Sequence, residues 1–290
     1  MRYGLQALGI GPGADPGVIA AAAMAAERRG FSTLWCGEHV VMVDEGDRPY
    51  PYAPGGRIPV PSDADWLDPL AVLTYAAAVT DRIDLATGIL LLPEHNPVLV
   101  AKQAASLDVL SGGRFRLGVG IGWSAAEFAA IGVEFAGRGD RADEYVEAMR
   151  ALWRDDVSSF HGSHVRFDRV RSYPKPLRRH VPVVIGGNSE AALDRVARYG
   201  DGWYGFGLAT DQVADHIGAL DAACRRRERS RGDITVAVSL SDGAPDRVGD
   251  LAALGVDELV LIGAPPGRPD EAAPWVDDLA DQWGVGSAPA

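Results

Sequence analysis

Glu38 and His39 form an adjacent acid and base directly after the apolar segment Leu34-Trp35-Cys36-Gly37. A carboxylate and an imidazole side by side can exchange a proton with a bound molecule or hydrogen-bond to a cofactor. The alternative is a solvated loop pair without a function. Together with His95 they offer too few converging ligands for a metal ion, so we expect no metal site. We predict Glu38 and His39 as catalytic residues.

A second pattern with chemical meaning is Gly186-Gly187-Asn188-Ser189, which follows Val183-Val184-Ile185 and precedes a helical period. Free backbone N–H groups at the start of a helix, with a nearby hydroxyl, suit a phosphate group. A simple helix cap at Asn188 or Ser189 is the alternative. The double glycine favours the anion site.

Two further glycine patterns stand at the ends of apolar segments. In Thr87-Gly88-Ile89 the glycine allows a bulge, and so a close approach of a planar ring to the backbone. The stretch from Gly118 through Gly120 to Gly122 lacks the third glycine that a dinucleotide fingerprint requires. We expect these glycines to make room for a bulky ligand, with Trp123 as a wall.

Short apolar segments alternate with amphipathic ones, the pattern of parallel βα units. We predict eight strands and eight helices, which place the chain in the α/β class as a single-domain (β/α)₈ TIM barrel over residues 1–290. The strands are 3–8, 33–36, 85–90, 115–119, 183–185, 202–204, 235–240 and 258–262. The helices are 18–29, 68–80, 97–110, 142–152, 189–199, 211–226, 246–254 and 276–283.

Two insertions interrupt this alternation. The first, Asp44 to Trp66, follows strand 2, is rich in proline and glycine, and is long enough to act as a lid. The second, Asp155 to Pro182, precedes strand 5 and contains two segments that could pair as a hairpin, 160–162 and 165–167. In such a barrel the carboxyl ends of the strands form the active-site rim, so the first insertion would cover that rim.

Composition excludes several classes of partner. A net charge of −12 disfavours nucleic acid and anionic membranes, and we read the basic stretch Arg166 to Arg179 as a solvated loop. The longest apolar run, 89–93, is too short to cross a bilayer. Cys36 and Cys224 form no metal or disulfide motif, and the N-terminal residues do not resemble a secretion signal. We therefore expect a cytoplasmic protein with a small-molecule substrate.

In their order along the chain, the motifs resemble those of the luciferase-like monooxygenase superfamily, most closely its deazaflavin-dependent (coenzyme F420) oxidoreductases. The resemblance covers Tyr3 to about Trp203. The residues that carry it are Gly37-Glu38-His39, Thr87-Gly88 with Leu92-Pro93 and Asn96-Pro97, Leu110 to Arg114, Gly118 to Trp123, and Gly186 to Ser189.

The resemblance implies a homodimer with the bacterial luciferase-like barrel fold. It also implies a non-proline cis peptide near Gly88 and Ile89, behind the central ring of the cofactor, and a phosphate at Gly186 to Ser189. The cofactor-binding residues it implies are His39, Thr87, Gly88, Ile89, Gly120, Gly122, Gly186, Gly187, Asn188 and Ser189. Trp123 stands where one branch of the family has an acid, with Glu127 a turn later, so the proton could come from Glu38, from His39 or from water.

The function we expect is hydride transfer between F420 and a partly apolar organic substrate, which Trp66, His95, Trp123 and Trp203 would contact. An FMN-dependent monooxygenase on the same fold is the alternative. A phosphate-binding barrel without redox chemistry is disfavoured, because Lys102 and Lys175 lie away from strand ends and cannot form a Schiff base there. A cofactor-binding protein without catalysis is the last possibility.

Overall fold

The eight predicted strands are all present in the computed structural model, which describes residues 1–44, 49–53, 55–243 and 245–286. They are β1 (Arg2–Gln6), β2 (Thr33–Cys36), β3 (Asp84–Thr87), β5 (Phe115–Gly120), β8 (Val183–Gly186), β9 (Gly202–Leu208), β10 (Thr235–Leu240) and β11 (Glu258–Ile262). Every pairing in this sheet is parallel, and β3 also pairs with β5, which closes the sheet into a barrel. The predicted (β/α)₈ barrel is confirmed.

The third predicted strand, 85–90, is divided in the structure. β3 ends at Thr87, and the short strand β4 (Leu90–Leu91) resumes pairing with β5 after a break. The peptide bond between Gly88 and Ile89 at this break is cis. The expected non-proline cis peptide is therefore present at the expected place.

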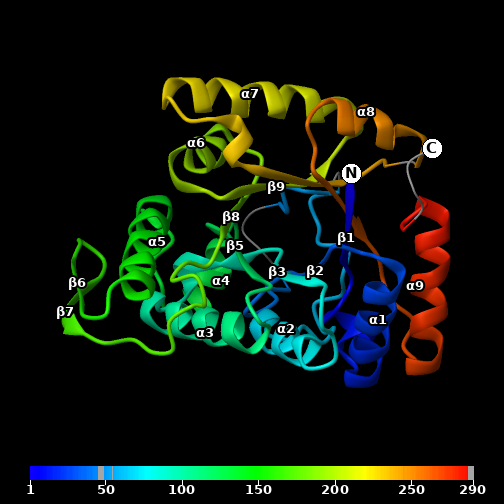
Figure 1. Ribbon diagram of the computed structural model, residues 1–290, viewed down its shortest axis with the longest axis horizontal. Coiled ribbons are helices and arrows are strands. Elements are labelled where there is room, and N and C mark those ends of the chain that lie inside the picture. Colours follow the sequence, from blue (N-terminus) through cyan, green and yellow to red (C-terminus); the bar gives the residue numbers. More distant parts are fainter. Residues whose placement is uncertain (45–48, 54, 244, 287–290) are drawn as a thin grey trace.

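Helices surround the barrel in Figure 1, and their starts follow from local capping. Asp15, Asp68 and Asn96 each accept a backbone N–H in the first turn, and each precedes a proline that favours the start of a helix. The helices are α1 (Pro16–Arg29), α2 (Pro69–Ala77), α3 (Pro97–Leu110), α5 (Arg138–Arg154), α6 (Glu190–Tyr199), α7 (Val213–Arg226), α8 (Val248–Ala253) and α9 (Pro269–Trp283).

One further helix, α4 (Ala125–Ala130), was not predicted. It has six residues, too few for an amphipathic period to be read in the sequence. Its local signal is the N-cap Ser124, whose side chain accepts the N–H of Glu127. The short 3₁₀ turns η1 (Gly11–Ala14), η2 (Leu92–Glu94), η3 (Thr210–Gln212), η4 (Arg231–Asp233) and η5 (Pro245–Arg247) complete the described elements.

Side chains alternate along each strand between two apolar layers, as the period of a strand requires. One set packs inside the barrel, where Trp35 and Tyr204 stack with ring centroids 4.7 Å apart. The other set packs between strands and helices, together with the small apolar residues of α1 and α3. The inner layer forms the floor beneath the rim.

The two insertions differ in structure. The second forms the predicted antiparallel hairpin, β6 (Ser158–His161) with β7 (Arg166–Val170), which projects beside α5 in Figure 1. The first begins at Asp44, and its residues 45–48 and 54 lie outside the described part. Trp66, at its end, forms an isolated bridge with Ile10 and so ties the insertion to the segment after β1.

Among the described residues, the helices are too short and too polar for any of them to cross a membrane.

Candidate functional site

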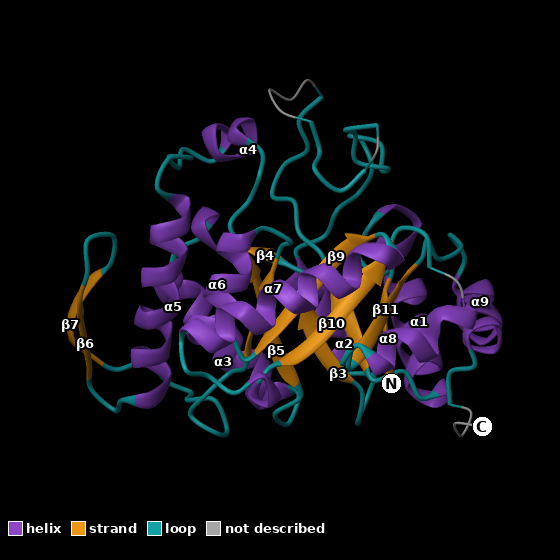
Figure 2. Cartoon of the chain, turned by 90° about the horizontal axis from the view of Figure 1, so that it is seen from above, coloured by secondary structure: helices purple, strands orange, loops and turns teal. Residues whose placement is uncertain are grey.

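The loops after β2 and β5 rise from the same end of the barrel, together with α4 (Figure 2). This end holds the carboxyl ends of the parallel strands, where barrel enzymes place their active sites. Glu38 and His39 follow β2, Glu94 and His95 follow β4, and Glu127 belongs to α4. The barrel thus gathers five ionisable side chains at one rim.

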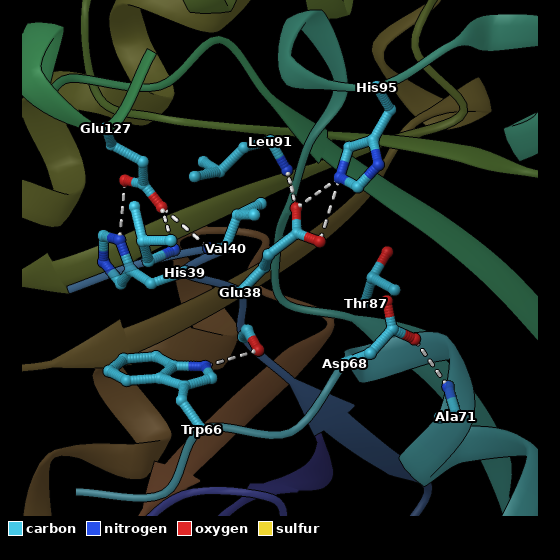
Figure 3. Close-up of polar contacts among 12 residues, drawn as sticks. Glu38, His39, Val40, Trp66, Asp68, Ala71, Thr87, Leu91, His95 and Glu127 are labelled. Atoms are coloured by element: carbon cyan, nitrogen blue, oxygen red, sulfur yellow. Dashed lines mark hydrogen bonds and ion pairs between the residues drawn. The ribbon is translucent and has the colours of Figure 1, made fainter. Parts of the chain in front are cut away.

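Glu38 forms the first imidazole–carboxylate pair, with His95 (Figure 3). Nε2 of His95 lies 3.0 and 3.1 Å from the two carboxylate oxygens, and the Leu91 N–H donates to Oε2 over 2.6 Å. Burial by itself lowers the pKa of His95, but the hydrogen bond and charge of Glu38 outweigh it, so the pKa of His95 is raised. This pairing favours the protonated form of His95.

His39 forms the second pair, with Glu127 (Figure 3). Nδ1 of His39 lies 2.9 Å from Oε2 of Glu127, while Oε1 accepts the backbone N–H of Val40 over 2.7 Å. Glu127 is 1% exposed, and its Oε1 also accepts the N–H of Val41 over 3.4 Å. The pair leaves Nε2 of His39 available to a bound molecule.

The Gly88–Ile89 peptide is held in place by the barrel interior. Nε2 of Gln6 donates to the Gly88 carbonyl oxygen over 3.0 Å, and the Tyr204 hydroxyl donates to Oε1 of Gln6 over 2.6 Å. The Thr87 hydroxyl donates to the Gly118 carbonyl oxygen over 2.6 Å. Gln6 and Tyr204 therefore position this peptide, a role that their sequence surroundings did not indicate.

We expected the glycines at the strand ends to make room for a ligand. At some of them a neighbouring side chain occupies the space instead. A β carbon on Gly120 would lie 1.8 Å from Cδ1 of Ile89, and one on Gly186 would lie 2.7 Å from Cγ2 of Ile89. These two glycines leave room for the Ile89 side chain. Gly122 has φ +74°, and a β carbon there would meet Phe128 and Glu94.

Aromatic side chains line the rim and continue into the first insertion. Trp66 and Trp123 both meet the His39 ring edge-on, with centroids 4.9 and 6.2 Å away. Tyr50 of the insertion lies 5.5 Å from Trp123, and Tyr52 lies 5.4 Å from Phe206 of β9. The two tyrosines thus connect the loop after β2 to the loop after β5 and to β9. Burial raises the pKa of both tyrosines.

The start of α6 is a turn in which the side chains of Asn188 and Ser189 both form hydrogen bonds. Gly187 has φ +113°, in the region that favours glycine, and Ser189 caps the helix by accepting the Ala192 N–H. The Asn188 side chain is committed to β9, because Nδ2 donates to the Phe206 carbonyl oxygen over 2.8 Å and Oδ1 accepts the Phe206 N–H. Asn188 therefore shapes the turn, and the N–H of Gly187 donates to the Tyr204 carbonyl oxygen over 3.3 Å.

Trp203 differs from the expectation that it contacts the substrate. It is fully buried in the layer between strands and helices, its ring stacks on His216 of α7, and its Nε1 donates to the Gly187 carbonyl oxygen. The neighbouring Tyr204 points into the barrel, so alternation along β9 turns Trp203 outward. We do not include Trp203 in the proposed substrate site.

Glu94 is a candidate residue that we did not predict, although it lies next to His95. It is 8% exposed, and burial, followed by the charges of Glu127 and Glu38, raises its pKa to about 9. Its only sequence signal was its place within the Leu92-Pro93 to Asn96-Pro97 motif. Within the described part of the chain, no three His, Cys, Asp or Glu side chains gather in a way that could hold a metal ion.

A (β/α)₈ barrel with acid–base pairs at its carboxyl rim defines a barrel enzyme. Residues 4–241 match the family model of the luciferase-like monooxygenases. An uncharacterised protein of Mycobacterium tuberculosis (strain ATCC 25618 / H37Rv) is 36% identical over 281 residues, which are 97% of this chain and 98% of that protein. The chain belongs to the luciferase-like monooxygenase family.

Solved structures share the fold. The monooxygenase RslO1 of Streptomyces bottropensis has a TM-score of 0.76 at 22% identity, over 99% of this chain and 100% of that one. The coenzyme F420-dependent tetrahydromethanopterin reductase of Methanopyrus kandleri has a TM-score of 0.69 at 17% identity, over 94% and 96%.

Proteins similar to this chain differ in their cofactor. Alongside that F420-dependent reductase stands an FMNH₂-dependent dimethylsulfone monooxygenase of Pseudomonas putida, 40% identical over 131 residues, which are 44% of this chain and 36% of that protein. The family membership therefore identifies an oxidoreductase or monooxygenase and leaves both cofactors as candidates.

Proposed function

We propose that the protein is an oxidoreductase that transfers a hydride between coenzyme F420 and a partly apolar organic substrate. The observation that carries the proposal is the position of the Glu38–His95 and His39–Glu127 pairs at the rim that also holds the cis Gly88–Ile89 peptide. Moving a hydride to a neutral substrate leaves a charge that a proton must balance. The rim supplies groups that hold such protons.

The described residues fit a flavin-like cofactor at three places. The start of α6 would hold its phosphate through backbone N–H groups and the Ser189 hydroxyl. The backbone at Gly88 and Ile89 would support the ring, and His39 would face its edge. Bound F420 would supply a two-electron hydride donor or acceptor.

The aromatic lid would contribute by excluding water from the reacting groups. Tyr50 and Tyr52 reach across to Trp123 and Phe206, so a substrate between them would meet mainly ring faces and edges. This supports a substrate with substantial nonpolar surface. Trp66 and His95 would complete its surroundings.

The test of the cofactor is titration of the purified protein with F420 and, separately, with FMN, followed by tryptophan fluorescence. Trp66 and Trp123 lie at the rim and should report binding there. We expect saturable quenching by F420 and none by FMN. The reverse result would favour an FMN-dependent monooxygenase. No response to either cofactor would favour a phosphate-binding barrel without redox chemistry.

We also propose that the protein forms a homodimer through α3. Leu99 and Leu110 are 63% and 66% exposed and lie eleven residues apart, which places them on one helix face. Light scattering coupled to gel filtration should give twice the 30.7 kDa of one chain. Replacing Leu99 with Lys should shift this mass toward the monomer, and a monomeric wild-type protein would contradict the proposal.

A further inference from the structure

Glu94 ends η2, the short turn between β4 and α3. It is 8% exposed, and neither of its carboxyl oxygens has a hydrogen-bond partner among the residues that the structure describes. Burying a carboxyl group without a partner costs free energy, and far more for its charged form. A buried group left unpaired at a rim of this kind is a candidate to meet a bound molecule.

The carboxyl group of Glu94 reaches the loop that follows β5. A β carbon built on Gly122 would lie 3.1 Å from Oε1 of Glu94, so the two residues are in close proximity. Because Gly122 has no side chain, its backbone borders the buried carboxyl group directly. Trp123, which meets the His39 ring, is the next residue of the same loop.

The surroundings of Glu94 favour its neutral form. Burial and the carboxylates of Glu127 and Glu38 raise its pKa to about 9. The neighbouring imidazoles of His39 and His95 are bound to those two carboxylates. At neutral pH the Glu94 side chain therefore carries a proton.

Two arginines of α5 reach the same segment without pairing with Glu94. Nε of Arg138 donates to the Gly122 carbonyl oxygen over 3.0 Å. The Arg141 guanidinium lies 6.0 Å from the centroid of the Phe128 ring, which also borders Gly122. Neither cation holds the Glu94 carboxyl group in its charged form.

We propose that Glu94 is the proton donor of this site. The inference rests on the proposed hydride transfer, here to a carbonyl substrate. Reduced F420, when bound, would give the hydride and its two electrons to the new C–H bond and would itself be oxidised by two electrons. The π bond of the carbonyl group would break, and its electron pair would move to the oxygen. The O–H bond of Glu94 breaks, its proton forms the O–H bond of the product, and solvent later returns a proton to the carboxylate.

The other two carboxyl groups of the rim are poorly suited to this task. Oε2 of Glu38 accepts the Leu91 N–H, and Oε1 of Glu127 accepts the Val40 N–H. Glu38 also contacts His95, and Glu127 also contacts His39 and the Val41 N–H. The carboxyl oxygens of Glu38 and Glu127 are therefore engaged by their neighbours, whereas those of Glu94 have no partner among the described residues, and a neutral Glu94 can both donate and accept.

The first test measures the protonation of Glu94 without turnover. Infrared difference spectra between pH 7 and pH 10 should show the carbonyl stretch of a protonated carboxylic acid in the wild-type protein and its loss as the pH rises. Glu94→Gln should lack this signal, and Glu147→Gln, on the exposed side of α5, should keep it. A wild-type protein without the signal, or a variant that retains it, would overturn the proposal.

The second test measures proton donation. Oxidation of reduced F420 by a panel of small aromatic ketones should slow by about 100-fold or more in Glu94→Gln. The affinity for F420, measured by fluorescence, should stay within about twofold, because the variant is neutral and of the same size. A wild-type rate in Glu94→Gln would contradict the proton-donor role, whereas wild-type protein that does not bind F420 would contradict the proposed function instead.

Discussion

Nδ1 of His39 lies 2.9 Å from Oε2 of Glu127, although 88 residues separate the two along the chain. The Ser124 cap starts α4 and so places Glu127 in its first turn, while β2 delivers His39 to the rim. Glu127 accepts from Nδ1 and from the Val40 N–H at the same time. The His39 ring is therefore held with Nε2 as its free edge.

Replacing Glu127 with Gln keeps the size of the side chain at position 127 but should weaken the contact that orients the His39 ring. We expect the rate of F420-linked turnover to fall by roughly 100-fold, with a shifted pH profile, because the imidazole loses its partner. Glu147→Gln on α5 is the matched control, since that side chain is exposed. An unchanged pH profile in Glu127→Gln would show that the pair has only a structural role.

The Glu38–His95 pair should be visible in the titration of His95. Glu38 raises the pKa of His95, so Glu38→Gln should lower it, as NMR of the imidazole protons would measure. A raised pKa stabilises the folded state fully below the unfolded value of about 6.5, and this contribution is lost as the pH rises through the folded value. The variant should therefore lose about 1–3 kcal/mol relative to wild type at pH 5.5 and less at pH 8.5. An unshifted His95 would contradict the pairing.

Glu94 should make the wild-type protein less stable as the pH rises. Its folded pKa of about 9 exceeds the ordinary glutamate value of 4.5, so ionising Glu94 between these two pH values lowers the stability of the folded state. Gln mimics the neutral acid, so Glu94→Gln and wild type should match below pH 4.5. At pH 7 to 8 the variant should be more stable by a few kcal/mol, at about 1.4 kcal/mol per pH unit. Urea unfolding at pH 5 and pH 8 would measure this, and parallel losses in both proteins would disprove it.

The start of α6 should bind the cofactor phosphate. Ser189→Asp keeps a good helix cap but adds a negative charge beside the phosphate, so F420 affinity should fall roughly tenfold. Ser189→Asn is the control, because it caps the helix without a charge. Equal affinities of the two variants for F420 would show that the phosphate does not bind at the start of α6. Thermal unfolding should confirm that α6 is intact in both variants.

The lid tyrosines should determine substrate affinity rather than cofactor affinity. Tyr52→Ala removes the ring that meets Phe206, a contact worth about 0.5–1.5 kcal/mol. We expect KM for an apolar substrate to rise up to about tenfold, with little change in F420 affinity. Tyr52→Phe keeps the ring and should behave like wild type. If Tyr52→Ala leaves KM unchanged, the lid does not contact the substrate.

The strands and most helices could be predicted because their signals are local. Apolar runs such as 235–240 and 258–262 match β10 and β11 to the residue, and caps such as Asn96 before Pro97 mark helix starts. The helix α4 is the exception, since six residues carry no readable period. The family motifs consist of residue types in a fixed order. They predicted the cis peptide at Gly88–Ile89 and the proposed phosphate site at Gly186 to Ser189.

The partners of those residues were decided by the tertiary structure. Closure of the barrel brings His95 to Glu38 across 57 positions and Glu127 to His39 across 88, and no local pattern encodes such pairings. Packing also places Ile89 against Gly120 and Gly186, and turns Trp203 away from the rim. The raised pKa of Glu94 depends on burial and on the nearby carboxylates. The sequence determined which groups stand at the strand ends, whereas burial and proximity, which exist only in the folded barrel, decided how they pair and where protons reside.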